Sequence, residues 1–371
     1  MREYLLVLLT AAMATYLTAG FWRRIALRYG AVAKVRDRDV HAVPIPYFGG
    51  VAMLVGLGVS LLMASALPFL GRLDVVTHDS WAILAAGAVI CLVGVVDDLL
   101  DLPAVVKLAG QVLAAGIVVL NGVRMYWIPL PNSIIALDNA TSVLITVLFI
   151  VLCANAVNFV DGLDGLASGV VAIGAGAFFL YTYLLAYEQD FVRATTASLV
   201  TVVTTGICLG FLPHNWFPAR MFMGDSGALL LGLLMAASTI SLTGQIDPAL
   251  LQAQGGGLVP SYLPIVLPLA IMALPILDLV LAYVRRTIAG RWWFVADKQH
   301  LHHRLLQLGH SQSRAVMVMY LWTALLSFGV ILLGLYASRL TFVIIAVIAI
   351  LAAVATLGPR MFRRARGGAR S

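Results

Sequence analysis

Residues 155–166 read Asn155-Ala156-Val157-Asn158-Phe159-Val160-Asp161-Gly162-Leu163-Asp164-Gly165-Leu166, and they close an apolar run. Asp161 and Asp164 are three residues apart, so both carboxylates can point the same way from a helix end. A glycine follows each of them, and bare backbone lets a phosphate or a metal ion approach closely. The stretch therefore predicts ion-binding chemistry at a membrane surface. The alternative is a plain loop in which Asp and Gly only make turns.

The rest of the chain is too apolar for a soluble globule. Of its 371 residues, 61% are hydrophobic and 11% are charged, whereas about a quarter of the residues of a soluble domain are charged. Eleven apolar stretches are long enough to cross a bilayer, which predicts an all-α polytopic membrane protein. The stretches lie near residues 3–22, 48–70, 81–96, 105–122, 139–157, 166–186, 192–212, 226–245, 261–284, 315–335 and 341–358.

Basic residues divide unequally between the two ends of these stretches. All but five of the 24 Lys and Arg fall on one side, the exceptions being Arg2, Arg72, Arg124, Arg193 and Arg339. The positive-inside rule then places the N-terminus outside and the C-terminus in the cytoplasm. The net charge of +7 is explained by this topology and by contact with anionic lipid, not by nucleic-acid binding.

One transmembrane catalytic domain is expected over residues 1–358, followed by a basic cytoplasmic tail at 359–371. Ionisable groups at membrane level are costly and mark functional sites, so the acids beside the cytoplasmic helix ends indicate an active site on that face. The expected cytoplasmic loops are 23–47, 97–104, 158–165, 213–225 and 285–314.

Asp97, Asp98 and Asp101 close the third apolar run, and Lys107 follows at the start of the fourth. Adjacent carboxylates can divide roles, one holding a cation and the other serving as base. A lysine suits a phosphate as a point charge. The alternative is that these carboxylates are merely solvated at the interface, and it applies best to Asp101.

Asp225 stands between two glycines where the eighth apolar run begins. It can be read as a helix N-cap or as a third acid of the same site. Magnesium usually takes one or two carboxylates together with phosphate oxygens and water. Three acidic helix ends around a nucleotide diphosphate fit that preference.

Two further segments carry polar side chains on the cytoplasmic side. The loop 285–314 contains His300, His302, His303 and Arg304, but no nearby Cys or Glu completes a zinc site. We expect donors to a sugar or a diphosphate there, the alternative being a basic membrane-surface segment. Residues 38–50 hold two prolines and a glycine pair, which form either a stiff wedge beside the site or a simple turn into a helix.

Four motifs together resemble the polyprenyl-phosphate N-acetylhexosamine-1-phosphate transferase superfamily. They are NAVNFVDGLDGLA, the DDxxD with DLPAxxKLAGQ, FMGDSG, and HLHHRLLQLGHSQ, in that superfamily's order. The HxHHR form and the segment containing His41, Pro44, Pro46, Gly49 and Gly50 resemble the WecA and TagO branch, not the MraY branch. Tyr47 departs from that branch, which often has Arg or a smaller residue there.

The resemblance implies that GlcNAc-1-phosphate passes from UDP-GlcNAc to undecaprenyl or decaprenyl phosphate, releasing UMP. It implies a Mg²⁺ cofactor, with Mn²⁺ as a substitute, in the inner (plasma) membrane of a bacterium, where the reaction begins the synthesis of an envelope polysaccharide. Homodimers are common in the superfamily. By the same resemblance, the metal ligands are Asp225 and Asp98, Asp97 is the base or positions the lipid phosphate, and Lys107 binds phosphate. The nucleotide-side loop is formed by Asn158, Asp161 and Asp164, and uracil is held or stacked by Asn215 and Phe222. His41 binds substrate, and the sugar-phosphate pocket is shaped by His300, His302, His303 and Arg304.

Three other functions are compatible with parts of this pattern. One keeps the fold and takes UDP-MurNAc-pentapeptide as donor. Another is a cation- or proton-coupled transporter, but that class predicts mid-helix acids and inverted repeats, whereas these acids end apolar runs. A third is a lipid-binding scaffold, which would tolerate loss of the motif acids. Within the transferase reading, direct attack by the lipid phosphate is preferred to a covalent intermediate on an aspartate.

Overall fold

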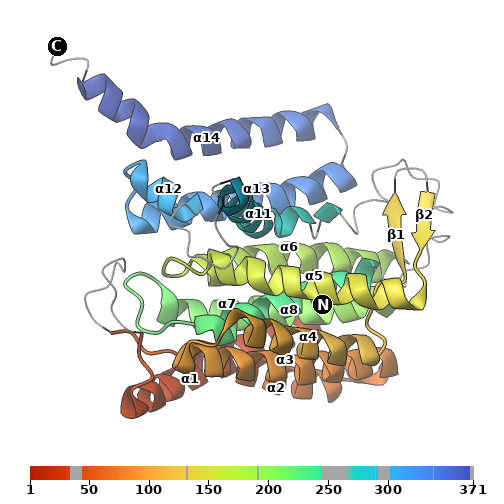
Figure 1. Cartoon of the computed structure of the whole chain (residues 1–371). Helices are drawn as coiled ribbons and strands as arrows, with labels where there is room; N and C mark the ends of the chain where they lie inside the picture. Colours follow the sequence, from red (N-terminus) through yellow and green to blue (C-terminus); the bar gives the residue numbers. More distant parts are fainter. Residues whose placement is uncertain are drawn as a thin grey trace.

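The computed structural model describes residues 1–33, 44–130, 133–189, 192–243, 266–267, 269–288, 290, 301–336 and 338–367. They form a polytopic membrane protein that is helical almost throughout (Figure 1). The elements are α1 (Arg2–Tyr29), α2 (Gly49–Ser65), η1 (Leu70–Arg72), α3 (Asp74–Leu100), α4 (Ala104–Leu120), β1 (Trp127–Leu130), β2 (Ser133–Ala136), α5 (Asn139–Val160), α6 (Leu166–Gln189), α7 (Val192–Asn215), α8 (Gly224–Thr243), α11 (Ala273–Ile288), α12 (Leu301–Gln307), α13 (Gln312–Leu335) and α14 (Arg339–Gly367).

Helices α1 to α8 run alternately in opposite directions, because short connections can only join antiparallel neighbours. The C-terminal ends of α1, α3, α5 and α7 therefore meet the N-terminal ends of α2, α4, α6 and α8. We call this the site end of the bundle, and the opposite end, which carries β1 and β2, the far end. Backbone hydrogen bonds show the meeting directly, since the amide of Gly49 donates to the carbonyl of Phe222 at 3.1 Å.

Helix α8 is the centre of the bundle. Every residue from Ser226 to Thr243 is buried, and α2, α3, α5 and α7 all pack against it. Glycine permits this close approach at the site end, since a Cβ atom at Gly50 or at Gly94 would overlap the backbone of Ser226. Those contacts place the first turn of α8 between the ends of α2 and α3.

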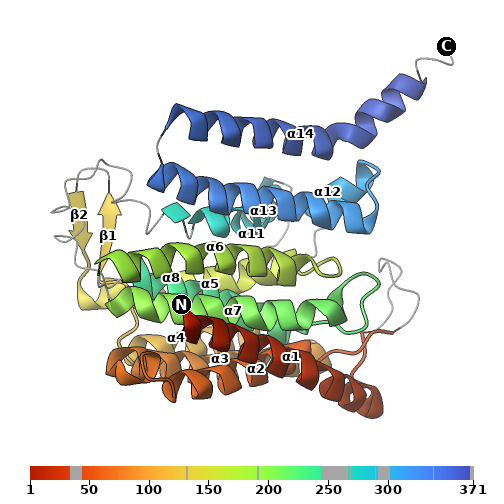
Figure 2. The same ribbon diagram turned by 180° about the vertical axis from the view of Figure 1, so that it is seen from behind.

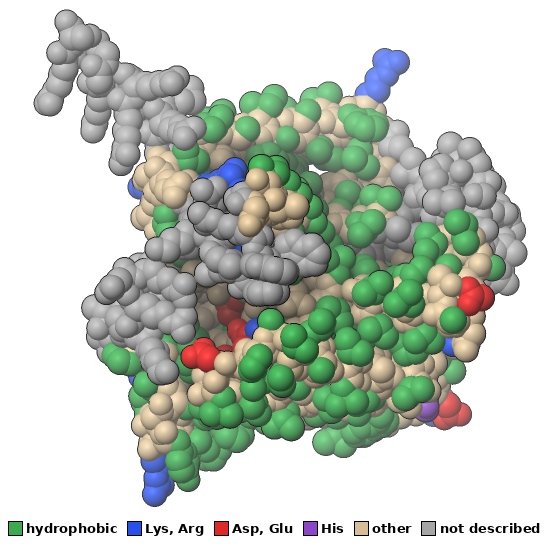
Figure 3. All heavy atoms as spheres, in the orientation of Figure 1, with side chains coloured by type: hydrophobic (Ala, Val, Ile, Leu, Met, Phe, Trp, Pro, Cys, Tyr) green, Lys and Arg blue, Asp and Glu red, His purple; other side chains and the backbone are tan. Residues whose placement is uncertain are grey.

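The lateral surface matches a bilayer. By length and composition alone, eight described helices could cross a membrane, and α2 and α4 are shorter apolar helices. Figure 3 shows many hydrophobic side chains along the flank of the helices and few charged ones, which lie toward the two ends. Helices α11 to α14 form a second group above α5 and α6, with α14 outermost (Figures 1 and 2). Thr356 joins α14 to the preceding helix, because Trp322 Nε1 donates to its hydroxyl at 3.0 Å.

The ends of several helices differ from the sequence-based expectation. Helix α2 ends at Ser65, not near residue 70, because Pro68 disfavours a helical conformation before it and η1 follows. Helix α3 begins at Asp74, seven residues before the expected start. The segments α1, α3, α5 and α7 also extend into the expected loops 23–47, 97–104, 158–165 and 213–225. Hydropathy marks where a helix leaves the membrane, whereas backbone hydrogen bonding continues beyond it.

The structure is consistent with the expected all-α membrane fold and adds one short element that the sequence did not indicate. Strands β1 and β2 form an antiparallel hairpin at the far end, with Trp127 opposite Ala136 and Leu130 opposite Ser133. Aromatic and β-branched residues favour such strands. The expected loop 285–314 also contains α12. The number of eleven spans stays a prediction, because the expected span 261–284 includes residues outside the described ranges.

Candidate active site

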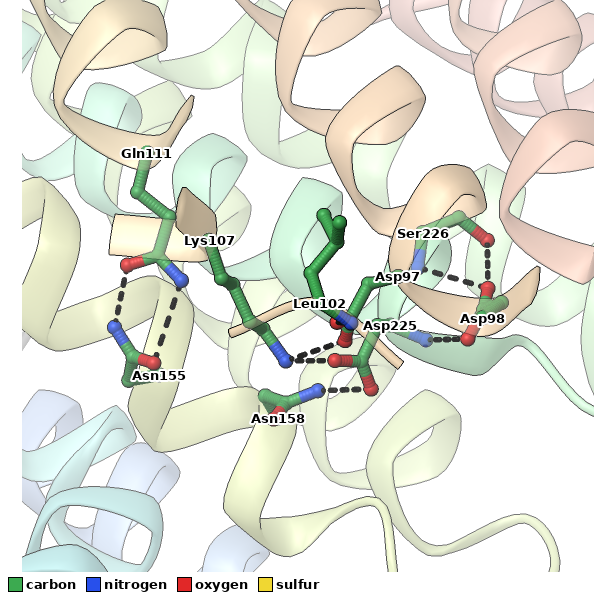
Figure 4. Close-up of polar contacts among 9 residues, drawn as sticks. All are labelled: Asp97, Asp98, Leu102, Lys107, Gln111, Asn155, Asn158, Asp225 and Ser226. Carbon is green, nitrogen blue, oxygen red and sulfur yellow. Dashed lines mark hydrogen bonds and ion pairs between the residues drawn. The ribbon is translucent and has the colours of Figure 1, made fainter. Parts of the chain in front are cut away.

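Four helices each contribute one polar side chain to a cluster at the site end (Figure 4). The ammonium of Lys107 on α4 lies 3.0 Å from Oδ2 of Asp97 on α3 and also contacts Oδ2 of Asp225 on α8. Nδ2 of Asn158 on α5 donates to the other oxygen of Asp225 at 2.8 Å. Side chains of Lys107 and Asp97 are 18% and 14% exposed. Two carboxylates thus share one cation in a partly desolvated place, where electrostatic interactions are stronger than in water.

Local backbone geometry orients Asp97 toward this cluster. Helix α3 ends at Leu100, and the next residue, Asp101, has a left-handed conformation with φ of 51°. The chain then turns back, and the amide of Leu102 donates to Oδ1 of Asp97 at 2.9 Å. Pro103 precedes the first residue of α4, so Lys107 emerges in the first turns of that helix. Asp97 is therefore held by a backbone amide on one oxygen and by Lys107 on the other.

Asp98 faces a different partner from its neighbour Asp97. Its Oδ1 accepts a hydrogen bond from the amide of Asp225 at 2.8 Å, and its Oδ2 accepts one from the hydroxyl of Ser226 at 3.1 Å. A carboxylate at a helix N-terminus is stabilised by the free amides and by the helix dipole. Gly224 has φ of 67°, and a Cβ atom there would overlap the Asp98 carboxylate. Asp98 thus fixes the first turn of α8 and the position of Asp225.

The turn between α5 and α6 is tied to the loop after α7. Asp164 is 4% exposed, and its Oδ2 accepts from the amide of Ala219 at 2.9 Å. The amide of Gly165 donates to Oδ1 of Asn215 at 3.0 Å, and Tyr320 of α13 donates to the carbonyl of Gly165. Asn215 uses its amide nitrogen as well, donating to the carbonyl of Met221 at 3.0 Å. These bonds make the second half of the Asp-Gly motif a rigid support.

Asp161 lies at the start of the same turn. Its side chain is partly buried, and this desolvation raises the pKa of its carboxyl to about 7, with the charges of Asp98 and Asp164 adding to the effect. A carboxyl of that kind favours a neighbouring cation or a proton. Asp161 is thus electrostatically linked to the cluster through Asp98.

The glycine-proline segment before α2 lies against the Asp225 loop. The amide of Phe222 donates to the carbonyl of Pro46 at 3.0 Å, and the amide of Gly50 donates to the carbonyl of Met223 at 3.0 Å. The rings of Tyr47 and Phe222 are 6.4 Å apart. The described part of this segment, residues 44–50, thus lies beside the loop that carries Asp225.

The histidine segment is described only in part. His41 and His300 lie outside the described residues, and for His302 and His303 only the backbone, in α12, is described. Arg304 is exposed. Oδ1 of Asp278, which is 1% exposed on α11, accepts from the amide of Leu301 at 3.0 Å and so anchors the start of α12.

The structure thus places half of the predicted site residues in two hydrogen-bonded groups. The first contains Asp97, Asp98, Lys107, Asn158 and Asp225, and the second joins Asp164 to Asn215. Sequence reasoning quoted Ser226, Gln111 and Asn155 within its motifs but gave no role to Ser226 or to the pair that the two amides form. The signal for that pair was present, since Gln111 is a polar residue in an apolar run four positions after Lys107.

The cluster can supply some, but not all, of the ligands of a hard divalent cation. Within the described residues, no three His, Cys, Asp or Glu side chains lie close enough to hold a metal ion by themselves. Asp97 and Asp225 nevertheless already share one positive charge, that of Lys107. Magnesium needs only one or two protein carboxylates when phosphate and water complete its shell, so the donors present fit it.

Fold and site together define a multi-pass membrane enzyme whose helix ends gather carboxylates and a lysine at one end of the bundle. The sequence profile of glycosyl transferase family 4 matches residues 80–243, which span the whole cluster. The chain is 44% identical to decaprenyl-phosphate N-acetylglucosaminephosphotransferase of Mycobacterium tuberculosis, over 98% of this chain and 90% of that protein. It is 33% identical to a probable undecaprenyl-phosphate N-acetylglucosaminyl 1-phosphate transferase of Bacillus subtilis, over 84% of this chain and 79% of that protein.

Similarity extends more weakly to a phospho-N-acetylmuramoyl-pentapeptide-transferase of Desulforudis audaxviator, at 29% identity over 80% of this chain and 86% of that protein. The chain belongs to the polyprenyl-phosphate N-acetylglucosamine phosphotransferases of glycosyl transferase family 4.

Proposed function

We propose that this protein transfers GlcNAc-1-phosphate from UDP-GlcNAc to a polyprenyl phosphate, releasing UMP and forming polyprenyl-diphosphate-GlcNAc. The observation that carries the proposal is the convergence of Asp97, Lys107 and Asp225 at one end of a membrane bundle. The near full-length identity to the mycobacterial decaprenyl-phosphate enzyme supports the same reaction. Decaprenyl and undecaprenyl phosphates are both suitable acceptors.

The reaction brings two anions together, so positive charge must be fixed where they meet. Lys107 is placed to bind a phosphate of either substrate, since its ammonium lies among helix ends and remains partly exposed. When bound, Mg²⁺ or Mn²⁺ would neutralise the diphosphate and polarise its phosphorus–oxygen bonds. Asp225 would hold that ion, with Asp98 or Asp97 as the second carboxylate.

The remaining residues position these groups. Asn158 holds one oxygen of Asp225 and directs the other toward the shared charge. Asp97 then orients the acceptor phosphate or removes its proton, and a lipid phosphate is sufficiently ionised near neutral pH to attack directly. Asp161 and Asp164 lie on the turn that would face the nucleotide, and Phe222 offers a partly buried ring for stacking on uracil.

The sugar side of the site is proposed to come from the histidine segment. His300, His302, His303 and Arg304 would contact the sugar and the diphosphate, and His41 would approach from the segment before α2. Asn215 was predicted to hold uracil. Because both ends of its amide bond to protein backbone, we propose that it acts by shaping the loop that carries Phe222.

We also propose that the site end faces the cytoplasm, with the N-terminus outside, in the inner (plasma) membrane of a bacterium. UDP-GlcNAc is water-soluble and the lipid phosphate lies at the membrane surface, so the reaction needs a site that both can reach. The distribution of Lys and Arg supports this orientation. Under this orientation the product is the first lipid-linked intermediate of an envelope polysaccharide.

The decisive experiment measures transfer of label from UDP-GlcNAc into organic-extractable lipid by purified protein and polyprenyl phosphate. Label is expected with magnesium, not with EDTA, and is expected to disappear in Asp225→Asn. The matched control is Glu3→Gln, a carboxylate of the far end. If EDTA has no effect, the metal part of the proposal is wrong. If no UDP-sugar yields lipid-linked label, the reaction itself is wrong.

A second candidate donor is UDP-MurNAc-pentapeptide, favoured only by the weaker similarity to the pentapeptide transferases. It is tested in the same assay by replacing UDP-GlcNAc. A cation-coupled transporter is disfavoured because the clustered carboxylates lie at helix ends. It would be tested by cation flux into proteoliposomes, where none is expected.

A further inference from the structure

A pair of amide side chains, one buried and one partly buried, lies one helical turn behind the charged cluster (Figure 4). Asn155 Nδ2 donates to Gln111 Oε1 at 2.6 Å, and Gln111 Nε2 donates back to Asn155 Oδ1 at 3.4 Å. Gln111 is 1% exposed. Asn155 Nδ2 also bonds to the carbonyl of Val151 at 2.8 Å, which fixes its rotamer on α5. The pair is reciprocal, so each amide satisfies the other.

The pair connects the same two helices that supply Lys107 and Asn158. Gln111 stands four residues after Lys107 on α4, and Asn155 stands three residues before Asn158 on α5. Residues three or four apart lie one above the other on a helix face. The amide pair and the two side chains that reach Asp225 therefore occupy facing surfaces of α4 and α5, in two consecutive layers.

This arrangement fixes the register of α4 against α5. An apolar contact between two helices tolerates sliding, because hydrophobic attraction has no direction. A reciprocal amide pair does not, because both hydrogen bonds lengthen when either helix shifts or rotates. Sliding by one residue would carry Lys107 about 1.5 Å along the helix axis, which is enough to separate its ammonium from one of the two carboxylates.

We propose that Gln111 and Asn155 are positioning residues, which hold Lys107 between Asp97 and Asp225 in the orientation that the transfer reaction needs. The expected change in kcat rests on the proposed transfer reaction. The expected change in the position of Lys107 does not depend on that reaction. A mere helix-packing role predicts reduced stability without a change in the behaviour of Lys107. The two roles are therefore separable by measurement.

The test compares Gln111→Leu with a matched control, Thr146→Val. The control also removes a polar contact of a buried side chain, but at the far end of α5. Thr146 lies on α5, and its hydroxyl accepts from the amide of Met125 at 3.0 Å, away from the cluster. For each protein, kcat and KM are measured per folded molecule. Gln111→Leu is expected to lose about tenfold in kcat with little change in KM, the signature of a misplaced group acting in the transition state. Thr146→Val is expected to keep the wild-type kcat.

Exchange of the two amides provides the rescue. Gln111→Asn makes the pair one methylene too short and Asn155→Gln makes it one too long, so each single variant should lose activity. The double variant restores the summed length and should recover most of the kcat. A double variant no better than the worse single variant would contradict the proposal, because the paired geometry would then not matter.

A third readout does not depend on turnover. Lys107 held by two carboxylates should react slowly with a water-soluble acylating reagent, and mass spectrometry of its peptide measures that rate. The rate should rise severalfold in Gln111→Leu and stay at the wild-type value in Thr146→Val. An unchanged rate in Gln111→Leu overturns the positioning role whatever the activity. A wild-type protein without transferase activity would instead contradict the proposed reaction and leave this comparison to decide the role of the pair.

Discussion

The two ends of the bundle use carboxylates in opposite ways. At the far end, Glu3 accepts from the amides of Phe69 and Leu70, each at 2.9 Å, and Asp138 caps α5 by accepting from the amide of Ala140 at 3.0 Å. Each of these acids is satisfied by nearby backbone. At the site end, Asp98 and Asp164 also accept hydrogen bonds from backbone amides, but Asp97 and Asp225 converge on one lysine from different helices. Figure 3 shows acidic side chains at both ends of the visible face.

This difference separates structural acids from functional ones. Both kinds lie at helix ends, so position alone does not distinguish them. A capping carboxylate accepts hydrogen bonds from backbone amides in place of water, so it needs no positively charged partner. Acids that share a cation repel one another, and such an arrangement persists only where other parts of the structure hold it in place. Convergence of charges from several helices is therefore the better sign of chemistry.

The largest effect is expected for Asp225→Asn. The variant keeps the size of the side chain and removes one of the two carboxylates that share Lys107, so transfer should fall by about a thousandfold. Its folding should be little changed, because Asp98 still caps α8. Steady-state kinetics with UDP-GlcNAc and thermal unfolding in detergent measure the two quantities. A loss below tenfold would place Asp225 among the structural acids.

A smaller loss, about a hundredfold, is expected for Lys107→Arg. The planar guanidinium keeps the charge but cannot occupy the compact site between two carboxylates in the same way. Lys107→Met, which removes the charge, should be at least as damaging. Kinetics of both variants beside wild type test the prediction. If Lys107→Arg retains full activity, the site needs a positive charge at this position but not the compact shape of the lysine ammonium.

Asp161 should make stability depend on pH. Burial raises the pKa of its carboxyl from 3.8 to about 7, so the folded protein keeps a proton that the unfolded chain releases. The free energy of unfolding therefore falls as pH rises from about 4 to about 7, by at most about 1.4 kcal/mol per pH unit. Above that interval it levels off. Thermal unfolding between pH 4 and 8 without divalent cations measures the slope. Asp161→Asn should reduce it, and an identical slope in that variant would contradict the assignment.

The smallest effect is expected at the far end. Glu3→Ala removes two hydrogen bonds to backbone and should lower the free energy of unfolding by about 1 kcal/mol. Activity per folded molecule should not change, because Glu3 touches nothing in the cluster. Thermal unfolding and label transfer on the same preparation give both values. A fall in kcat would show that the two ends are coupled.

Sequence reasoning identified the charges of the site but not the partner of each. Asp97 and Asp98 are adjacent, and both were predicted to act in catalysis. Successive residues of a helix point about 100° apart, so Asp97 faces Lys107 while Asp98 faces the start of α8. Which direction each takes depends on the crossing of α3 and α8 at Gly94, and no local pattern encodes that crossing.

The fold was predictable to a similar degree. Long apolar runs identified α1 and α3 to α8 well, because a bilayer demands helices of that length. The pattern did not show that α3 continues outward to Asp74, since the polar residues at its start are outside any apolar window. The hairpin of β1 and β2 was also missed, because two short strands between spans leave little periodic signal.

The ion pair between Lys107 and Asp225 joins residues 118 positions apart in the chain, and this separation bears on biosynthesis. A ribosome adds about 5–20 residues per second, so Lys107 and Asp97 enter the membrane many seconds before their third partner is made. Charges at the middle of a bilayer would be very costly during that wait. At the ends of α3 and α4 they stay in contact with water until α8 is inserted among the earlier helices. The chain can therefore be assembled span by span, and the pair of Lys107 and Asp97 gains its third partner, Asp225, only when α8 is inserted.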